Sequence, residues 1–121
     1  MATINKTIEQ VDRVKINPYS DEDKYRWISE LDGMVRREVL QEGGTFAYSY
    51  PDDGDVELIV PYPYDGIYAH WLEAKIDFYD KRYEDYNNTV AMFYSLFDAY
   101  KKAYIRENTP KSSGNLKNVM G

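Results

Sequence analysis

The stretch that decides the fold runs from Asp65 to Glu107 and reads DGIYAHWLEAKIDFYDKRYEDYNNTVAMFYSLFDAYKKAYIRE. It contains no proline, and its single glycine is Gly66. Ten of its apolar and aromatic residues follow one another in alternating steps of four and three, which places them along one stripe of a helix. These residues are Leu72, Ile76, Tyr79, Tyr83, Tyr86, Val90, Phe93, Phe97, Tyr100 and Tyr104. A stripe of this kind is the seam along which helices pack, so the rest of the chain is expected to pack against it.

The stripe does not decide whether 65–107 is one helix or two. A single helix of this length would span roughly 60 Å, much more than the dimensions of a compact domain of this size. Asn87-Asn88-Thr89 offers a turn and a helix cap, so a break within 84–89 would give two antiparallel helices. We therefore expect two C-terminal helices, with one long broken helix as the alternative.

Two further helices are predicted before this stretch. Thr7-Ile8-Glu9-Gln10 has the form of a capping box and opens a short helix that Asn17-Pro18 ends. Ser20, followed by three acidic residues, opens a longer helix that Gly43-Gly44 ends. The apolar stripe of this second helix consists of Tyr25, Ile28, Leu31, Val35 and Val39.

Between the second helix and the long stretch, the spacing of the apolar residues changes to two. Phe46, Tyr48 and Tyr50 alternate with small residues, and Val56, Leu58 and Val60 alternate on the far side of a proline- and aspartate-rich turn. This pattern predicts a β-hairpin at about 45–60. Since a lone hairpin is marginal in water, it is expected to lie on the helices or against a partner.

The expected fold class is therefore mainly α. It is a small helical bundle with a short N-terminal helix, a long second helix, two C-terminal helices or one broken helix, and one inserted β-hairpin. A chain of 121 residues forms one domain, taken as 1–107, and the polar residues 108–121 are expected to form an extended C-terminal arm.

Composition narrows the classes of function. Net charge is −6, with 15 basic against 21 acidic residues, which disfavours specific DNA binding because phosphates are neutralised by Lys and Arg. No apolar run approaches the roughly 20 residues of a membrane span, so no membrane partner is expected. The 13 tyrosines and two tryptophans are residue types enriched at protein–protein contacts, although they also cap small cores.

No chemical signature favours an enzyme, and we expect no catalytic, cofactor-binding or metal-binding residues. His70 is the sole histidine and the chain has no cysteine, so neither a thiolate metal site nor a catalytic triad can be built from them. The acidic cluster at 52–57 lacks the spacing of a calcium loop, and turn chemistry explains it. The stretch PYPYDGIYAHW at 61–71 is the best candidate for a surface contact, the alternative being that its rings only cover the end of the bundle.

Three segments of the sequence resemble a known class of proteins: NPYSDEDKYRWISELDG at 17–33, PYDGIYAHWLEAKIDFYDKRYEDYNN at 63–88 and TVAMFYSLFDAY at 89–100. Together with the element order, they resemble head–tail connector (adaptor, head-completion) proteins of siphophage type from phages and prophages of Gram-positive hosts. The sequence departs from better-known connectors in having a short hairpin where they have a longer β insert.

The resemblance implies a virion structural protein in the neck, assembled in the host cytoplasm. It implies a homo-oligomeric ring, typically dodecameric, which docks beneath the portal protein, contacts a downstream neck or tail protein, and lets double-stranded DNA pass without specific binding. Its contact residues would include Trp27, Leu31, Tyr62, Tyr64, Tyr68 and Trp71, with Pro110, Lys111, Leu116 and Lys117 in the arm. The alternatives are another neck protein, such as a stopper or tail-completion protein, and a soluble protein-binding adaptor or regulator outside the virion.

Overall fold

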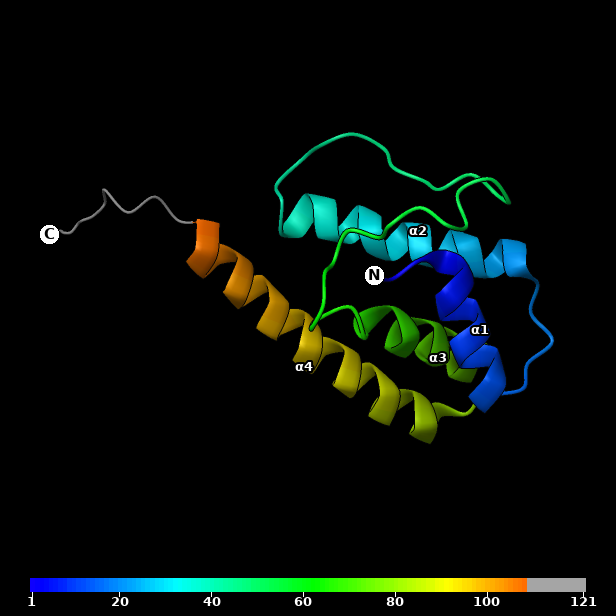
Figure 1. The fold of residues 1–121 in the computed structure, drawn as a ribbon. Coiled ribbons are helices and arrows are strands. Elements are labelled where there is room, and N and C mark those ends of the chain that lie inside the picture. The colour runs from blue at the N-terminus through cyan, green and yellow to red at the C-terminus, as the bar shows by residue number, and fades with distance from the viewer. Residues whose placement is uncertain (109–121) are drawn as a thin grey trace, which may run out of the picture.

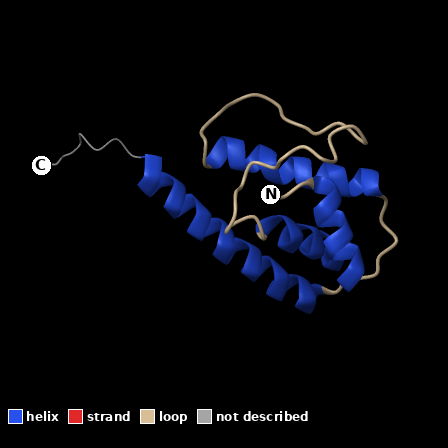
Figure 2. Ribbon diagram, in the orientation of Figure 1, coloured by secondary structure: helices blue, strands red, loops and turns tan. Residues whose placement is uncertain are grey.

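Four helices make up the regular structure in the computed structural model, which describes residues 1–108 (Figures 1 and 2). They are α1 (Ile4–Val14), α2 (Asp21–Glu38), α3 (Ile67–Tyr79) and α4 (Tyr83–Asn108). Helices α3 and α4 form a hairpin, and α1 and α2 pack against α3. The predicted mainly helical bundle is confirmed. Most of the expected arm, residues 109–121, lies outside the described residues.

Side chains at the helix starts explain where the first two helices begin. Ser20 caps α2 as predicted, because its side chain accepts a hydrogen bond from the Asp23 amide at 3.1 Å. The first helix begins earlier than the capping box at Thr7 predicted. Thr3 is its cap and accepts from the Lys6 amide, while the Thr7 hydroxyl donates to the Thr3 carbonyl inside the helix.

The long aromatic stretch is two helices, but the break lies at residues 80–82 rather than 84–89. Lys81 adopts a left-handed backbone with φ of 62°, and the Arg82 amide donates to the Asp77 carbonyl, which closes the end of α3. The predicted turn around Thr89 is helical instead. There the Thr89 hydroxyl donates to the Asp85 carbonyl one turn earlier, so it does not cap a new helix.

The core lies where α1, α2 and the inner face of α4 meet α3. Its fully buried large side chains include Ile4, Val11, Ile28, Leu31, Val35, Ile67, Tyr68, Leu72, Ile76 and Phe93. Burying a side chain of this size contributes about 1.5–3 kcal/mol each to the hydrophobic driving force. The central position of α3 explains why the aromatic stretch organises the chain.

The predicted β-hairpin at 45–60 is wrong, since no strand occurs among residues 1–108. The alternation marks only some of the covered side chains: Leu58 and Val60 are buried and Tyr48 is half-buried, whereas Tyr50 and Val56 are 48% and 44% exposed. The backbone amides, however, do not pair as in a hairpin: those of Asp53 and Val56 close local turns, and others bond to distant parts of the chain. The Tyr48 amide donates to the Ser29 hydroxyl at 2.8 Å and the Leu58 amide donates to the Ala2 carbonyl at 2.9 Å.

One buried carboxylate joins this long loop to two helices. Asp32 of α2 is fully buried and accepts hydrogen bonds from the Tyr48 hydroxyl, from the Tyr68 hydroxyl at 2.6 Å and from the Ile59 amide at 3.3 Å. The Tyr68 hydroxyl in turn accepts from the Val60 amide at 2.8 Å. Burial raises the pKa of Asp32, and the three donors act in the opposite direction by favouring its charged form.

A second buried carboxylate fastens the other end of the bundle. Asp77 of α3 accepts from the Lys15 ammonium at 2.8 Å and from the Thr89 hydroxyl at 3.2 Å. These contacts tie the residue after α1 and the first turns of α4 to the end of α3.

Loss of the Tyr68 hydroxyl is expected to destabilise the fold. Tyr68→Phe leaves the Val60 amide without its acceptor and Asp32 without one of its donors, at a cost of about 1–3 kcal/mol in the free energy of unfolding. Urea unfolding followed by circular dichroism measures this difference. Tyr62→Phe is the matched control, because that side chain is 84% exposed and its loss should change stability very little. Equal stability of the two variants would contradict the assigned role of the Asp32 network.

Alkaline pH is expected to weaken the same contacts. Burial, and next the Asp32 carboxylate, raise the pKa of Tyr48 and Tyr68 above the usual value for a tyrosine. A phenol with a raised pKa in the folded state contributes stability that is fully present below its unfolded pKa of about 10 and is lost as pH rises further. Denaturant titrations between neutral and strongly alkaline pH should therefore show stability falling above about pH 10. The fall should be shallower in Tyr68→Phe, and an identical slope would contradict the linkage.

Candidate interaction surface

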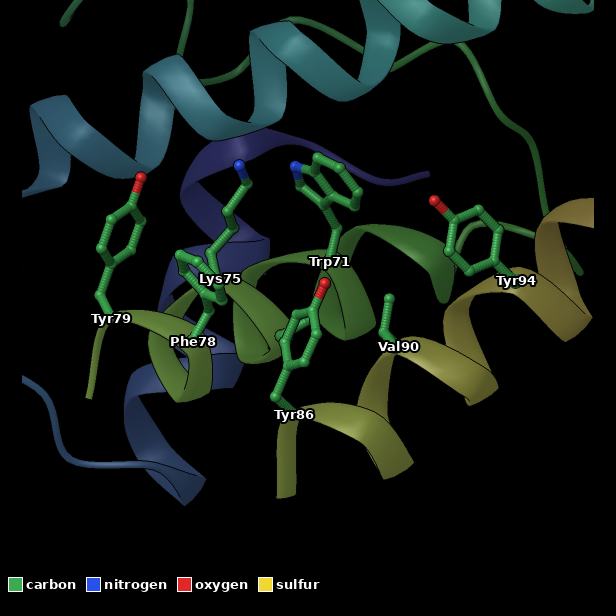
Figure 3. Close-up of a pocket in the computed structure, with 8 residues that line it drawn as sticks. Trp71, Lys75, Phe78, Tyr79, Tyr86, Val90 and Tyr94 are labelled. Carbon is green, nitrogen blue, oxygen red and sulfur yellow. The ribbon is translucent and has the colours of Figure 1, made fainter. Parts of the chain in front are cut away.

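A groove between α3 and α4 is lined mainly by aromatic side chains (Figure 3). It encloses about 200 Å³. Helix α3 contributes one side of the groove and α4 the other. The lining consists of Trp71, Ala74, Lys75, Phe78 and Tyr79 from α3, and of Tyr86, Val90 and Tyr94 from α4.

The groove exists because the stripe of the two helices is longer than the core that covers it. Towards the middle of each helix the stripe residues are buried, as Leu72 and Phe97 illustrate. Near the turn at 80–82 they are covered less: Tyr79 stacks on Trp27 of α2 with ring centroids 5.6 Å apart yet is 49% exposed, and Tyr83 is 55% exposed. The seam predicted from the sequence is therefore part core and part surface.

The rings in the groove hold one another in place. Phe78 contacts Tyr86 across the two helices with ring centroids 5.5 Å apart, and Trp71 contacts the buried Phe93 at 5.0 Å. The Trp71 indole also donates to the Trp27 carbonyl at 2.8 Å, which anchors the floor of the groove to α2. Such mutual packing orders the side chains before any partner arrives and lowers the entropic cost of binding.

Charged and polar groups border the groove, and one of them, Lys75, forms an ion pair with Glu30. The Lys75 ammonium lies 5.0 Å from the centroid of the Trp71 ring and 3.2 Å from a carboxylate oxygen of Glu30. Beyond Tyr79, the Tyr19 hydroxyl donates to Asp80 at 2.7 Å, and this hydrogen bond raises the pKa of Tyr19 to about 12. An apolar floor with an ammonium and phenols around it suits an apolar or aromatic side chain of a partner protein.

The structure separates the predicted contact residues into three groups. Trp27, Leu31 and Tyr68 are buried in the core of the chain, where its own residues already cover them. Tyr62 is exposed, and Tyr64 and Trp71 are partly buried. Of these six, Trp71 alone lines the groove. The arm residues Pro110, Lys111, Leu116 and Lys117 lie outside the described residues, so their contacts remain predictions.

Sequence reasoning did not single out Phe78 and Tyr94 as surface residues, yet they line the groove and are 46% and 50% exposed. Each is the direct neighbour of a stripe residue, Tyr79 and Phe93 respectively. An aromatic residue one position off a helical stripe lies at the edge of the buried face. The adjacent aromatic pairs Phe78-Tyr79 and Phe93-Tyr94 were the sequence signal that could have identified these two groove residues.

The other chemically distinctive residues do not assemble into a metal site in the described part of the chain. No group of three or more His, Cys, Asp or Glu side chains among residues 1–108 is placed to hold a metal ion. His70 faces a shallow surface of α4 lined by Met92 and Leu96, and its buried Nδ1 has no hydrogen-bond partner among the described residues. None of the four described helices combines the length and the apolar character needed to cross a membrane.

Comparisons of the chain with protein-family models, with curated proteins and with solved structures found no match.

Two neighbouring rings on α4 should respond very differently to truncation. Phe93→Ala removes a fully buried ring that packs on Trp71 and Phe97 and should cost about 3–5 kcal/mol. Tyr94→Ala removes a half-exposed groove residue and should cost about 1 kcal/mol or less. Denaturant unfolding of both variants measures the difference. Comparable losses would show that Tyr94 belongs to the core and that the groove is not a free surface.

Proposed function

We propose that this chain is a non-enzymatic virion structural protein: a head–tail connector subunit that forms a ring beneath the portal and extends the DNA channel to the tail. The observation that carries the proposal is the preordered aromatic groove between α3 and α4. Soluble monomers rarely leave so many large rings together on one face, and aromatic clusters with polar edges are typical of protein–protein contacts.

Support also comes from the order of the elements. A short helix, a longer capped helix, an inserted segment, an aromatic-rich helix and a final helix are what the resemblance to connectors implies. The inserted segment, residues 39–66, is a loop in the chain described above, so it departs further from the β insert of better-known connectors.

The charge of the chain agrees with a channel that conducts DNA. At a net charge of −6, the subunit repels the phosphate backbone overall and does not hold it. A ring of such subunits would let the duplex pass without specific binding. The partners implied are further copies of the chain, the portal protein and a downstream neck or tail protein.

Two acidic substitutions in the groove test the proposal. Phe78→Glu combined with Tyr94→Glu places carboxylates where an apolar partner surface would lie, and burying them unpaired is strongly unfavourable. Particles assembled with this variant should lack the protein or the tail, while helix content by circular dichroism stays unchanged. Val14→Glu combined with Ile16→Glu makes the same change in charge at two exposed positions outside the groove lining, and this variant should assemble normally.

A reconstruction of the wild-type particle provides the decisive measurement. Density for this chain is expected between portal and tail, with the α3–α4 groove in contact with a neighbouring subunit. Density at another level of the neck would favour a stopper or tail-completion protein. Its absence from the particle would overturn the proposal and favour the soluble adaptor or regulator.

A further inference from the structure

Charge is distributed very unevenly along this chain. Residues 1–98 contain 10 basic and 20 acidic side chains, whereas residues 99–121 contain five basic and one acidic. The acidic body therefore carries a net charge of −10 and the C-terminal end a net charge of +4. Opposite charges of this size attract two copies of the chain over about a Debye length, most strongly when their unlike ends face each other.

The acidic body has a cavity suited to a cation. It lies between α2 and the long loop, encloses about 290 Å³ and is walled by Tyr25, Tyr48 and Tyr50, with Glu22 and Arg26 beside them. The Tyr25 and Tyr50 rings meet edge to face at 4.8 Å, and Asp32 holds the Tyr48 hydroxyl. Aromatic walls with a carboxylate at the edge are the combination that binds ammonium and guanidinium groups.

Further carboxylates surround this cavity. Asp21, Asp53 and Asp55 are close enough to act on the Tyr25 hydroxyl in the cavity wall, and Asp52 follows the lining residue Tyr50 by two positions. The one cation in the lining, Arg26, already pairs with Asp23 at 3.0 Å. Burial first, and then Asp21, Asp55 and Asp53 among the neighbouring groups, raise the pKa of the Tyr25 hydroxyl, as a negative local potential requires.

The tip of the loop lies very close to the helices. A Cβ atom at Gly54 would overlap the Tyr25 hydroxyl and the Asn5 side chain, and the Asn5 amide donates to the Gly54 carbonyl at 3.0 Å. The cavity wall at the loop is therefore held in place by packing as well as by hydrogen bonds.

The basic end presents cations that the described chain does not neutralise. Lys102 and Arg106 are exposed on one face of α4, one turn apart, and neither forms an ion pair with another residue of 1–108. In Figure 1 the end of α4 and the start of α2 lie at opposite sides of the molecule. The basic end of one chain thus cannot reach its own acidic cavity through the described residues.

We propose that Lys102 and Arg106 at the end of α4 dock at the tyrosine-walled acidic cavity of a second copy of this chain. The contact is head to tail, so each copy uses one end as donor and the other as acceptor. Such a heterologous contact repeats from copy to copy and closes into a ring when the rotation allows it. The inference rests on the proposed function in so far as that function requires a ring of identical subunits.

The experiment reverses the charge of each end separately in the full chain. Variant A carries Lys102→Glu and Arg106→Glu, and variant B carries Glu22→Lys and Asp52→Lys. Each alone sets like charges against each other at the contact and should weaken self-association about tenfold or more. Mixed in equal amounts, A and B again offer unlike charges at every contact, so alternating mixed oligomers should form.

Native mass spectrometry and sedimentation at low and high salt provide the readout. Wild-type association should weaken as the salt concentration rises. The control variant carries Lys6→Glu and Arg13→Glu, which make the same change in net charge as variant A at exposed positions of α1. This control should associate as wild type does. The inference would be overturned if the wild-type chain stayed monomeric at low salt. It would also be overturned if variant A or variant B alone associated as wild type does, or if the two variants formed no mixed oligomers with each other. The proposed function is tested separately, in the particle. A ring in the particle in which the end of α4 does not contact the acidic cavity of the neighbouring subunit would contradict the docking contact but not the proposed function.

Discussion

The buried carboxylate of Asp32 is the contact on which the arrangement of this chain depends. A loop as long as residues 39–66, with no strand pairing of its own, must find partners for its buried amides elsewhere. Asp32 meets that need directly at Ile59, and Tyr68 extends it by accepting from Val60 while donating to Asp32. Helix α2, helix α3 and the loop thereby share one hydrogen-bonded network in which each group has a partner. Such a network is costly to break in a medium of low dielectric constant.

The Asp32 network also has a consequence at the surface. By holding the Tyr48 hydroxyl, Asp32 positions one wall of the acidic cavity between α2 and the loop. The loop that covers the core on its inner side therefore also forms a wall of the cavity that we propose as a docking site. A single buried group links the stability of the fold to the shape of a surface site.

The α3–α4 hairpin supplies the second surface by a different physical route. Its aromatic stripe continues to the turn at 80–82, where Trp27 of α2 stacks on Tyr79 but the rings of Tyr79 and Tyr83 remain about half exposed. In the assembly that we propose, the apolar groove and the electrostatic contact would make different contributions. Charged ends govern the rate and direction of encounter, whereas buried aromatic area governs how long a contact lasts.

The sequence alone determined the helical class, the cap at Ser20 and the apolar faces of α2, α3 and α4, because each depends on spacing between near neighbours. Tertiary structure decided what spacing cannot express. Residues 45–60 have the alternation of a hairpin, yet three of their amides bond to Ala2, Ser29 and Asp32, which are distant in sequence. The break at 80–82 likewise follows from a left-handed Lys81 and from Asp77 binding Lys15 and Thr89. The aromatic stripe predicted which residues lie along the seam between the helices. The packing of the other helices determined which of these residues are core and which are surface.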